Sequence, residues 1–511
     1  MKNIVKYIMI ALIAFATCSC NDFLEENPSN ATYTFNAIED IPGAQTALNG
    51  TYRLMTASSY YGRDMLIYGD YKGGDFGLTT SGIAGDALYF FTHNPSSGNY
   101  SGFWTQGYTI LLQANNIIES IEAGKVPAQG TSEEKKVKDI HGQALAIRAL
   151  VHFDLTRLYG YPYAKDNGAS WGVPIADKTL RSDDQLRRNT VAECYTQIIA
   201  DLTSAISLLS DDKKVGAINL YGAKALLARA YLYKHDWENA YTTAKSIIDD
   251  NKYIAYTATN WVESWGKQDA SESIFELIVR PLENDLGSTS PRAYFAPRNM
   301  KGLNGRGELG PIMVSDIFLN DFTDNPAHSA DARMAIFGLD EFGNGKNSAS
   351  ASIPGRKGWM MKYEGDGKNP ASAVNVKVIR LTEVLMIAAE AALKKQTKDI
   401  DNAVIWINKV RSRNPSLTDL TNSEPINNLL VEIDFQRRVD LIGEGHRFFD
   451  VLRNNGTISY VDGGFWTQLP NGGRGSTVDW NFYKIVLPIY INELNANPNI
   501  RDQQNPGADY Q

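Results

Sequence analysis

The chain has 511 residues, a formal net charge of −8 and a pI near 5.4. This acidic balance excludes binding to a nucleic-acid backbone as a main role, because phosphate binding needs a basic surface. Hydrophobic residues make up 43% of the sequence, enough for a large core, and the three cysteines Cys18, Cys20 and Cys194 are too few for a disulfide framework.

The first residues have the pattern of a targeting segment, Met1–Ser19. It begins with two lysines and continues with an apolar run, Tyr7–Ala16, which is shorter than the roughly 20 residues that span a membrane. Small residues then precede Cys20, so the segment resembles a lipoprotein signal cut to leave Cys20 as the lipidated first residue. Cys18 is the rival lipid site, and an ordinary secretory signal is the alternative. The acidic stretch 21–26 is similar to the surface-export signal of Bacteroidetes lipoproteins, so we expect a mature protein tethered by several acyl chains.

Apolar residues at helical spacing dominate the first half of the mature chain. Four such stretches are Ile41–Thr56, Trp104–Ala123, Thr131–Tyr161 and Thr190–Leu209. Asn219–Asn251 then predicts two helices joined by a tight turn at Lys234–Asp236. The order of Leu227, Tyr231 and Ala240 in it matches a tetratricopeptide unit, a helical hairpin of about 34 residues. One hairpin cannot bury its apolar face alone, so we expect further helical pairs beside it.

Two regions lack helical periodicity. Gly69–Gly102 interleaves glycines with aromatic residues. Loops longer than about 15 residues inside a domain are usually functional or disordered, and the aromatic content argues against disorder. Residues 251–375 are rich in Gly, Pro, Asn and Ser. Within them we expect a strand at Ser273–Val279 and a helix at Ile312–Phe322. We also expect two small hairpins, at Gly358–Tyr363 and at Val374–Val378.

Helical periodicity returns near the C-terminus. Leu381–Lys395 and Asp401–Arg413 predict a second, looser helical pair. Pro425–Ile442 predicts a helix that is broken at Gly443–Gly445, and His446–Arg453 predicts a short helix after it. Tyr483–Leu487 is a strand-like run.

These elements predict an all-α core of tetratricopeptide-like helical hairpins with an irregular, loop-rich lobe that contains a few short strands. After the signal (1–19) and a tether (20–40), we expect a single domain over 41–511. Its helical scaffold covers about 41–250 and 379–455, and its loop-rich ligand lobe covers about 69–102 and 251–378.

The sequence carries no specific signature of catalysis. Gly305, Gly307 and Gly310 have the spacing of a dinucleotide loop, but polar residues stand where the preceding strand is required. His141 and His152 would share a helix face about 16 Å apart, too far to share one metal ion. Carboxylates are plentiful, yet no spacing singles out a glycosidase pair. We expect neither a cofactor nor a metal, and the enzyme class stays open without specific support.

Arg437–Arg453 is the densest charged stretch inside an apolar frame. Arg447, Asp450 and Arg453 are three residues apart, which predicts an Arg–Asp–Arg ladder on one helix face. We interpret the stretch as a partly buried ion network that holds the last helices onto the core, with catalysis as the minor alternative.

The same stretch resembles the C-terminal hallmark of the SusD/RagB family, nutrient-binding outer-membrane lipoproteins of Bacteroidetes. Asp440 replaces the usual Glu of that hallmark and Val451 the usual Leu. Other agreements occur in the expected order at Cys20, Leu158–Gly160, Gly172–Ile175 and Arg380–Val384. The resemblance implies four tetratricopeptide-like hairpins and an irregular lobe that builds the ligand site. It also implies a protein, not an enzyme, that caps a SusC-like TonB-dependent transporter and delivers oligosaccharides to it, whereas RagB-like members serve peptides.

A glycan is favoured over a peptide because aromatic rings stack on sugar rings while Asp, Asn and Arg exchange hydrogen bonds with hydroxyls. A peptide site would more often present a strand edge or a large apolar groove. The candidate residues come from three aperiodic aromatic stretches, Gly69–Gly102, Leu286–Gly310 and Gly343–Gly365. Loop packing is the alternative role of each candidate. The predicted stacking rings are Phe76, Tyr89, Tyr294 and Trp359, and the predicted hydrogen-bonding partners are Asp75, Asn94, Arg292 and Arg356.

Overall fold

The computed structural model describes most of the chain from residue 38 onward. The described residues are 38–78, 86–97, 100–181, 183–283, 286–296, 312–339, 357–363, 373–460, 477–507 and 510. Cys18 and Cys20, Arg356 and the Gly305–Gly310 motif therefore lie outside the described residues. Among the described residues, no helix is long and apolar enough to cross a membrane.

The α-helices carry most of the fold. In chain order they are α2 (Ile41–Met55), α3 (Asp64–Tyr71), α4 (Asp86–Tyr89), α5 (Ser101–Glu122), α6 (Thr131–Tyr159), α7 (Val191–Leu208), α8 (Leu220–Lys234), α9 (Trp237–Asp249), α10 (Pro291–Phe295), α11 (Asp316–Phe318), α12 (Leu381–Lys394), α13 (Ile400–Arg411), α14 (Ile426–Asp440), α15 (Arg447–Arg453) and α16 (Ile491–Ala496).

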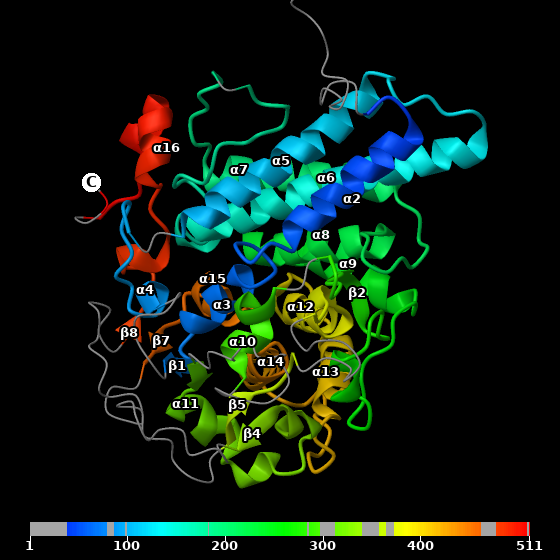
Figure 1. The fold of residues 1–511 in the computed structure, drawn as a ribbon. Helices are drawn as coiled ribbons and strands as arrows, with labels where there is room; N and C mark the ends of the chain where they lie inside the picture. Colours follow the sequence, from blue (N-terminus) through cyan, green and yellow to red (C-terminus); the bar gives the residue numbers. More distant parts are fainter. Residues whose placement is uncertain are drawn as a thin grey trace, which may run out of the picture.

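The long helices stack as successive antiparallel neighbours. Figure 1 shows α2, α5, α6 and α7 side by side at one end of the molecule, with α8, α9, α12 and α13 continuing below them. The predicted hairpin is confirmed as α8 and α9, and its turn is sharp because His235 adopts a left-handed backbone conformation with φ 61°. Both helices start at capping side chains, Asn219 and Asp236, which accept hydrogen bonds from backbone N–H groups of the first turn.

The strands are short and form four two-stranded antiparallel sheets. β1 (Phe76–Leu78) pairs with β3 (Ile312–Val314), β2 (Ser273–Leu277) with β6 (Val376–Arg380), β4 (Phe337–Leu339) with β5 (Lys357–Met360), and β7 (Ile458–Ser459) with β8 (Thr477–Val478). Figure 1 shows β4, β5 and α11 at the end opposite α5 and α6. The all-α core with a loop-rich part containing a few short strands is therefore confirmed.

Three local predictions are wrong. Ile312–Phe322 is not one helix: its first residues form β3, because Ile312 pairs with Leu78, and helical turns begin only at Asp316. Tyr483–Leu487 is not a strand but opens as a 3₁₀ turn, Tyr483–Ile485. The two predicted hairpins are also single strands that pair with distant segments. Gly358–Tyr363 overlaps β5, which pairs with β4, and Val374–Val378 overlaps β6, which pairs with β2.

The aperiodic region near Gly69 contains a helix that the sequence pattern did not show. All eight residues of α3 are buried, so its sequence has no polar face and no helical periodicity. Gly69 is required there, because a Cβ at this position would lie 2.1 Å from the backbone oxygen of Gly445. The turn at Gly443–Gly445, which ends α14, thus packs directly on α3.

Candidate functional site

Aromatic side chains join the three stretches that were predicted to bind ligand. The ring of Phe76 in β1 lies 5.4 Å from that of Phe295 in α10, and Phe295 stacks on Tyr363, just after β5, at 6.0 Å and 23°. Strand β3 extends this contact because it pairs with β1 and packs against β5. Segments more than 200 residues apart in sequence therefore meet in one place. We call these elements, β1, β3, β5 and α10, the aromatic lobe.

Three tyrosines surround one arginine at this lobe. Arg63 donates through Nη1 to the hydroxyl of Tyr294 at 3.1 Å, and its guanidinium lies 4.8 Å from the centre of the Tyr294 ring. Burial lowers the pKa of Arg63, but the ion pair that its Nε forms with Asp64 at 2.6 Å outweighs this effect and raises the pKa, and Tyr294 and Tyr100 add to the rise. Tyr100 is half-buried, and the buried hydroxyl of Tyr71 has no hydrogen-bond partner among the described residues. An aromatic face beside charged and hydroxyl donors is suited to a polyhydroxylated ligand.

Only part of the predicted ligand set lies in the aromatic lobe. Phe76, Tyr294 and Trp359 lie there, with exposed fractions of 1%, 2% and 7%. Tyr89 is 6% exposed and packs against Phe90 and Tyr460 instead. Rings buried this deeply offer little free face in this conformation, so their packing role is visible and their ligand role stays a prediction.

The predicted hydrogen-bonding residues differ in their surroundings. Asp75 is already paired, because Arg438 of α14 donates through Nε to its Oδ1 at 2.7 Å. The side-chain oxygen of Asn94 accepts from the backbone N–H groups of Ser96 and Ser97, both at 2.9 Å, and so builds a local turn. Arg292 is buried in α10. For these three residues too, contact with a ligand stays a prediction.

The charged residues of the C-terminal hallmark form a buried ion network. Asp440 accepts from Arg413, from Arg380 at 2.5 Å and from Arg333 at 3.4 Å. Glu444, after the α14 helix, accepts from Arg380 and from Lys362 at 2.6 Å. Burial raises the pKa of Asp440, but the three guanidinium groups outweigh it and hold that pKa far below its usual range. Charges buried at this depth are tolerated because each is paired and hydrogen-bonded.

The predicted Arg–Asp–Arg ladder is correct in one step and wrong in the other. Arg453 does donate to Asp450 at 2.9 Å. Arg447 instead donates to Asp434 at 2.9 Å, and the second partner of Asp450 is Arg437 of α14. The ladder fails because α14 folds back against α15, so that Arg437 takes the place beside Asp450 that was predicted for Arg447. The network interpretation is confirmed, and Asp450 is buried fully rather than partly.

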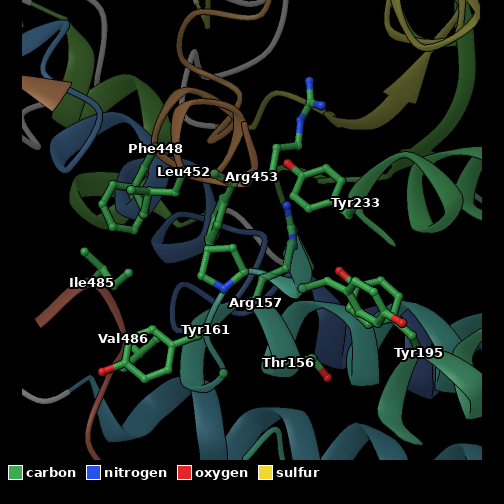
Figure 2. Close-up of a pocket in the computed structure, with 14 residues that line it drawn as sticks. Thr156, Arg157, Tyr161, Tyr195, Tyr233, Phe448, Leu452, Arg453, Ile485 and Val486 are labelled. Carbon is green, nitrogen blue, oxygen red and sulfur yellow. The ribbon is translucent and has the colours of Figure 1, made fainter. Parts of the chain in front are cut away.

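Figure 2 shows a tyrosine-lined pocket between the end of α6, α7, α8 and α15. Arg157 occupies its centre, with Tyr195 and Tyr233 on one side and Ile485 and Val486 on the other. The free volume is about 30 Å³, large enough for a water-sized molecule, whereas ligand pockets usually enclose about 300–1,000 Å³. In this conformation the pocket is too small for a sugar ring.

No metal centre is visible in the described ranges, where no three His, Cys, Asp or Glu side chains are grouped to hold an ion. His152 is buried and accepts from the backbone N–H of Ala176 at 3.1 Å. Its burial lowers the pKa to about 3, so the ring is neutral at physiological pH and serves the local packing.

Comparison with known proteins agrees with the fold and the hallmark. Residues 22–232 match a family described as starch-binding and associating with the outer membrane, and residues 342–507 match the SusD family. SusD-like protein P2 of Formosa agariphila is 26% identical over 490 residues, covering 88% of this chain and 90% of that one.

Solved structures extend the match over nearly the whole chain. A SusD superfamily protein from Bacteroides thetaiotaomicron is 32% identical with a TM-score of 0.82, covering 92% of this chain and 100% of that chain. Another, from Bacteroides vulgatus, is 33% identical with a TM-score of 0.79, covering 93% of this chain and 100% of that chain. This chain belongs to the SusD/RagB family.

Proposed function

We propose that this protein is a lipid-anchored cell-surface receptor that captures oligosaccharides and delivers them to a SusC-like TonB-dependent transporter. Its family membership, with half of the match described as starch-binding and outer-membrane associated, supports the glycan and the location. Cys20, at the end of a signal-like segment, supports the lipid anchor.

The observation that carries the proposal is the convergence of three aromatic stretches at one lobe, with the partly exposed Arg63 and Tyr100 beside it. We propose that a sugar ring stacks on Tyr100 while Arg63 donates to its hydroxyl groups. The predicted residues Asp75, Phe76, Arg292 and Trp359 are proposed to shape and support this site, and ligand contact by Tyr89, Asn94 and Arg356 stays a separate prediction.

The pairing of the hallmark charges argues against an enzyme. Glu444, Asp450 and Asp440 each accept from arginine or lysine side chains inside the core. A general acid or nucleophile must reach its substrate, and carboxylates held in this way do not. We therefore propose a binding role without catalysis.

The direct test is calorimetry of the protein from residue 21 onward against a panel of oligosaccharides. Tyr100→Ala is expected to weaken binding by about 1–3 kcal/mol, the usual contribution of a stacked aromatic platform. Tyr294→Ala is expected to weaken binding as well, because it removes the ring and hydroxyl that hold Arg63 in place. Trp171→Ala is the matched control, because Trp171 is an aromatic residue with 42% exposure outside the aromatic lobe. Equal affinity of all three variants would place the ligand elsewhere. Binding of peptides in the absence of any glycan binding would replace the glycan proposal with the RagB-like alternative.

A further inference from the structure

A groove of about 420 Å³ opens between α12, α14 and α15. It differs from the tyrosine-lined pocket of Figure 2, although Arg453 lines both. Its volume falls in the range that holds small ligands. None of the predicted ligand residues that the structure describes lines it, so it is independent of the site proposed at the aromatic lobe.

Arg437 gives this groove an unused hydrogen-bond donor. The side chain of Arg437 is 2% exposed, and its Nε and Nη2 donate to the two oxygens of Asp450 at 2.9 and 3.0 Å. Its Nη1 is buried and has no hydrogen-bond partner within the described part of the chain. Buried guanidinium nitrogens are normally satisfied, so an orphaned one beside an open groove points to an acceptor supplied by a ligand.

The charges around the groove favour an anionic acceptor. Four cationic side chains line it against three carboxylates, namely Lys394, Arg437, Arg447 and Arg453 against Glu390, Asp434 and Asp450. Each carboxylate is already paired: Glu390 with Arg453 and Lys394, Asp434 with Arg447, and Asp450 with Arg437 and Arg453. The lining residues therefore carry one positive charge in excess, and guanidinium groups form strong, charge-assisted hydrogen bonds with carboxylates.

Beside the polar Asn454 and Thr457, the rest of the lining has an apolar part. Leu430, Val431, Ile433 and Val451 supply it, and Val431 at the entrance is 70% exposed. A pyranose presents an apolar C–H face together with polar groups at its edge. We propose that the groove binds one uronic acid unit, with its carboxylate accepting from Nη1 of Arg437 and its C–H face against the α14 side chains.

The test is titration of the mature protein with galacturonate, with galactose as the neutral probe of the same size and a short peptide acid as a second carboxylate. Arg437→Lys keeps the charge that pairs with Asp450 and removes the guanidinium Nη1. Val431→Trp fills the entrance from an exposed position that the fold tolerates. Asn428→Trp places the same ring on an exposed position of α14 outside the groove and is the matched control.

We expect galacturonate to bind in preference to galactose, and Arg437→Lys to weaken it about 10- to 100-fold, as for a lost hydrogen bond to a charged group. Val431→Trp should abolish binding and Asn428→Trp should leave it unchanged. Neither groove variant should alter binding of neutral oligosaccharides at the aromatic lobe. The proposal is overturned if galacturonate and galactose bind alike or not at all, if only the peptide acid binds, or if Val431→Trp still binds galacturonate as the native protein does.

Discussion

Arg437 and Asp450 form a two-point ion pair that ties α14 to α15, with Nε and Nη2 donating to opposite carboxylate oxygens at 2.9 and 3.0 Å. The pair spans the turn at Gly443–Gly445, so it fixes the angle at which the chain reverses. Burial raises the pKa of Asp450, but Arg437 and Arg453 outweigh this effect and hold the pKa below its usual value. The hallmark sequence of the family thus forms a structural clamp between α14 and α15.

Replacing Asp450 by Ala should destabilise the protein strongly. The change leaves two buried guanidinium groups, those of Arg437 and Arg453, without their shared carboxylate, and such losses cost about 3–5 kcal/mol. Urea unfolding followed by circular dichroism measures the effect. Asp434→Ala is the control, since Asp434 pairs with Arg447 but is 49% exposed, and its loss should cost about 1 kcal/mol or less. Native stability of Asp450→Ala together with abolished glycan binding would reverse the structural assignment.

Gly445→Ala should also be destabilising, through the backbone rather than through charge. Gly445 has φ 79°, and a Cβ there would lie 2.4 Å from the backbone oxygen of Met65 in α3. A left-handed conformation costs an L residue about 1–2 kcal/mol, and forced overpacking adds about 1–3 kcal/mol. Gly50→Ala on α2 is the comparison, because nothing lies within 4 Å of its added methyl group. Thermal unfolding should give a clearly lower melting temperature for Gly445→Ala than for Gly50→Ala. Equal melting temperatures would show that α3 can move away from the turn.

Sequence periodicity located the long helices within a few residues but missed elements that depend on distant partners. α5 has buried and exposed faces that repeat at helical spacing. α3 is buried on every side, so its pattern carries no helical signal. β1 and β3 are three residues each and exist because Phe76 pairs with Val314 across a gap that no local pattern spans.

The candidate site shows the same division between local and distant information. Spacing alone correctly paired Asp450 with Arg453 on one helix, but it could not reveal that Arg437 would approach from α14. The aromatic loops were predicted to bind ligand, and the structure adds that three of these stretches meet in one place. Burial of each ring depends on its neighbours from other segments, as Phe76 shows against Phe295. Arg63 carried no motif, and only its approach to Tyr294 marks it.

Cys20→Ala should release the protein from the membrane fraction, because stable attachment needs the acyl chains that a lipidated cysteine carries. The measurement is fractionation of cells followed by immunoblotting, with Cys18→Ala as the matched variant. We expect Cys18→Ala to remain membrane-bound. If Cys20→Ala stays in the membrane fraction and Cys18→Ala leaves it, Cys18 is the lipid site. If both variants stay in the membrane fraction, lipidation of a single one of these cysteines is excluded as the anchor.

Lys72 is a buried cation without a carboxylate partner among the described residues. Its Nζ donates to the Tyr68 hydroxyl at 3.1 Å and to the backbone oxygen of Lys484 at 3.1 Å, and lies 3.3 Å from Nε2 of His93. The charged and titratable groups facing it are therefore Lys484, His93 and Tyr68. Burial, followed by repulsion from Lys484, lowers the pKa of Lys72 well below its usual value.

Lys72→Met should therefore make the protein more stable at neutral pH and change how its stability depends on pH. The unfolded chain holds the Lys72 proton up to about pH 10.4, whereas the folded chain releases it at lower pH. Since the unfolded state binds more protons in this window, native stability rises with pH there, by as much as about 1.4 kcal/mol per pH unit. The Met variant lacks this dependence, so the amount by which its free energy of unfolding exceeds that of the native protein should shrink as the pH rises toward 10.

Urea unfolding at pH 7, 8 and 9.5 measures the difference in free energy of unfolding between Lys72→Met and the native protein. Groups that titrate in both proteins contribute equally and cancel in this difference. Lys409→Met, at an exposed position of α13, is the control and should show a small effect with no trend across the same pH values. An advantage of Lys72→Met that stays constant or grows as the pH rises would mean that Lys72 remains charged in the folded protein. In that case the aromatic rings of Tyr68, Phe91 and Phe448, whose centres lie 4.4–4.9 Å from Nζ, stabilise the ammonium through cation–π contacts.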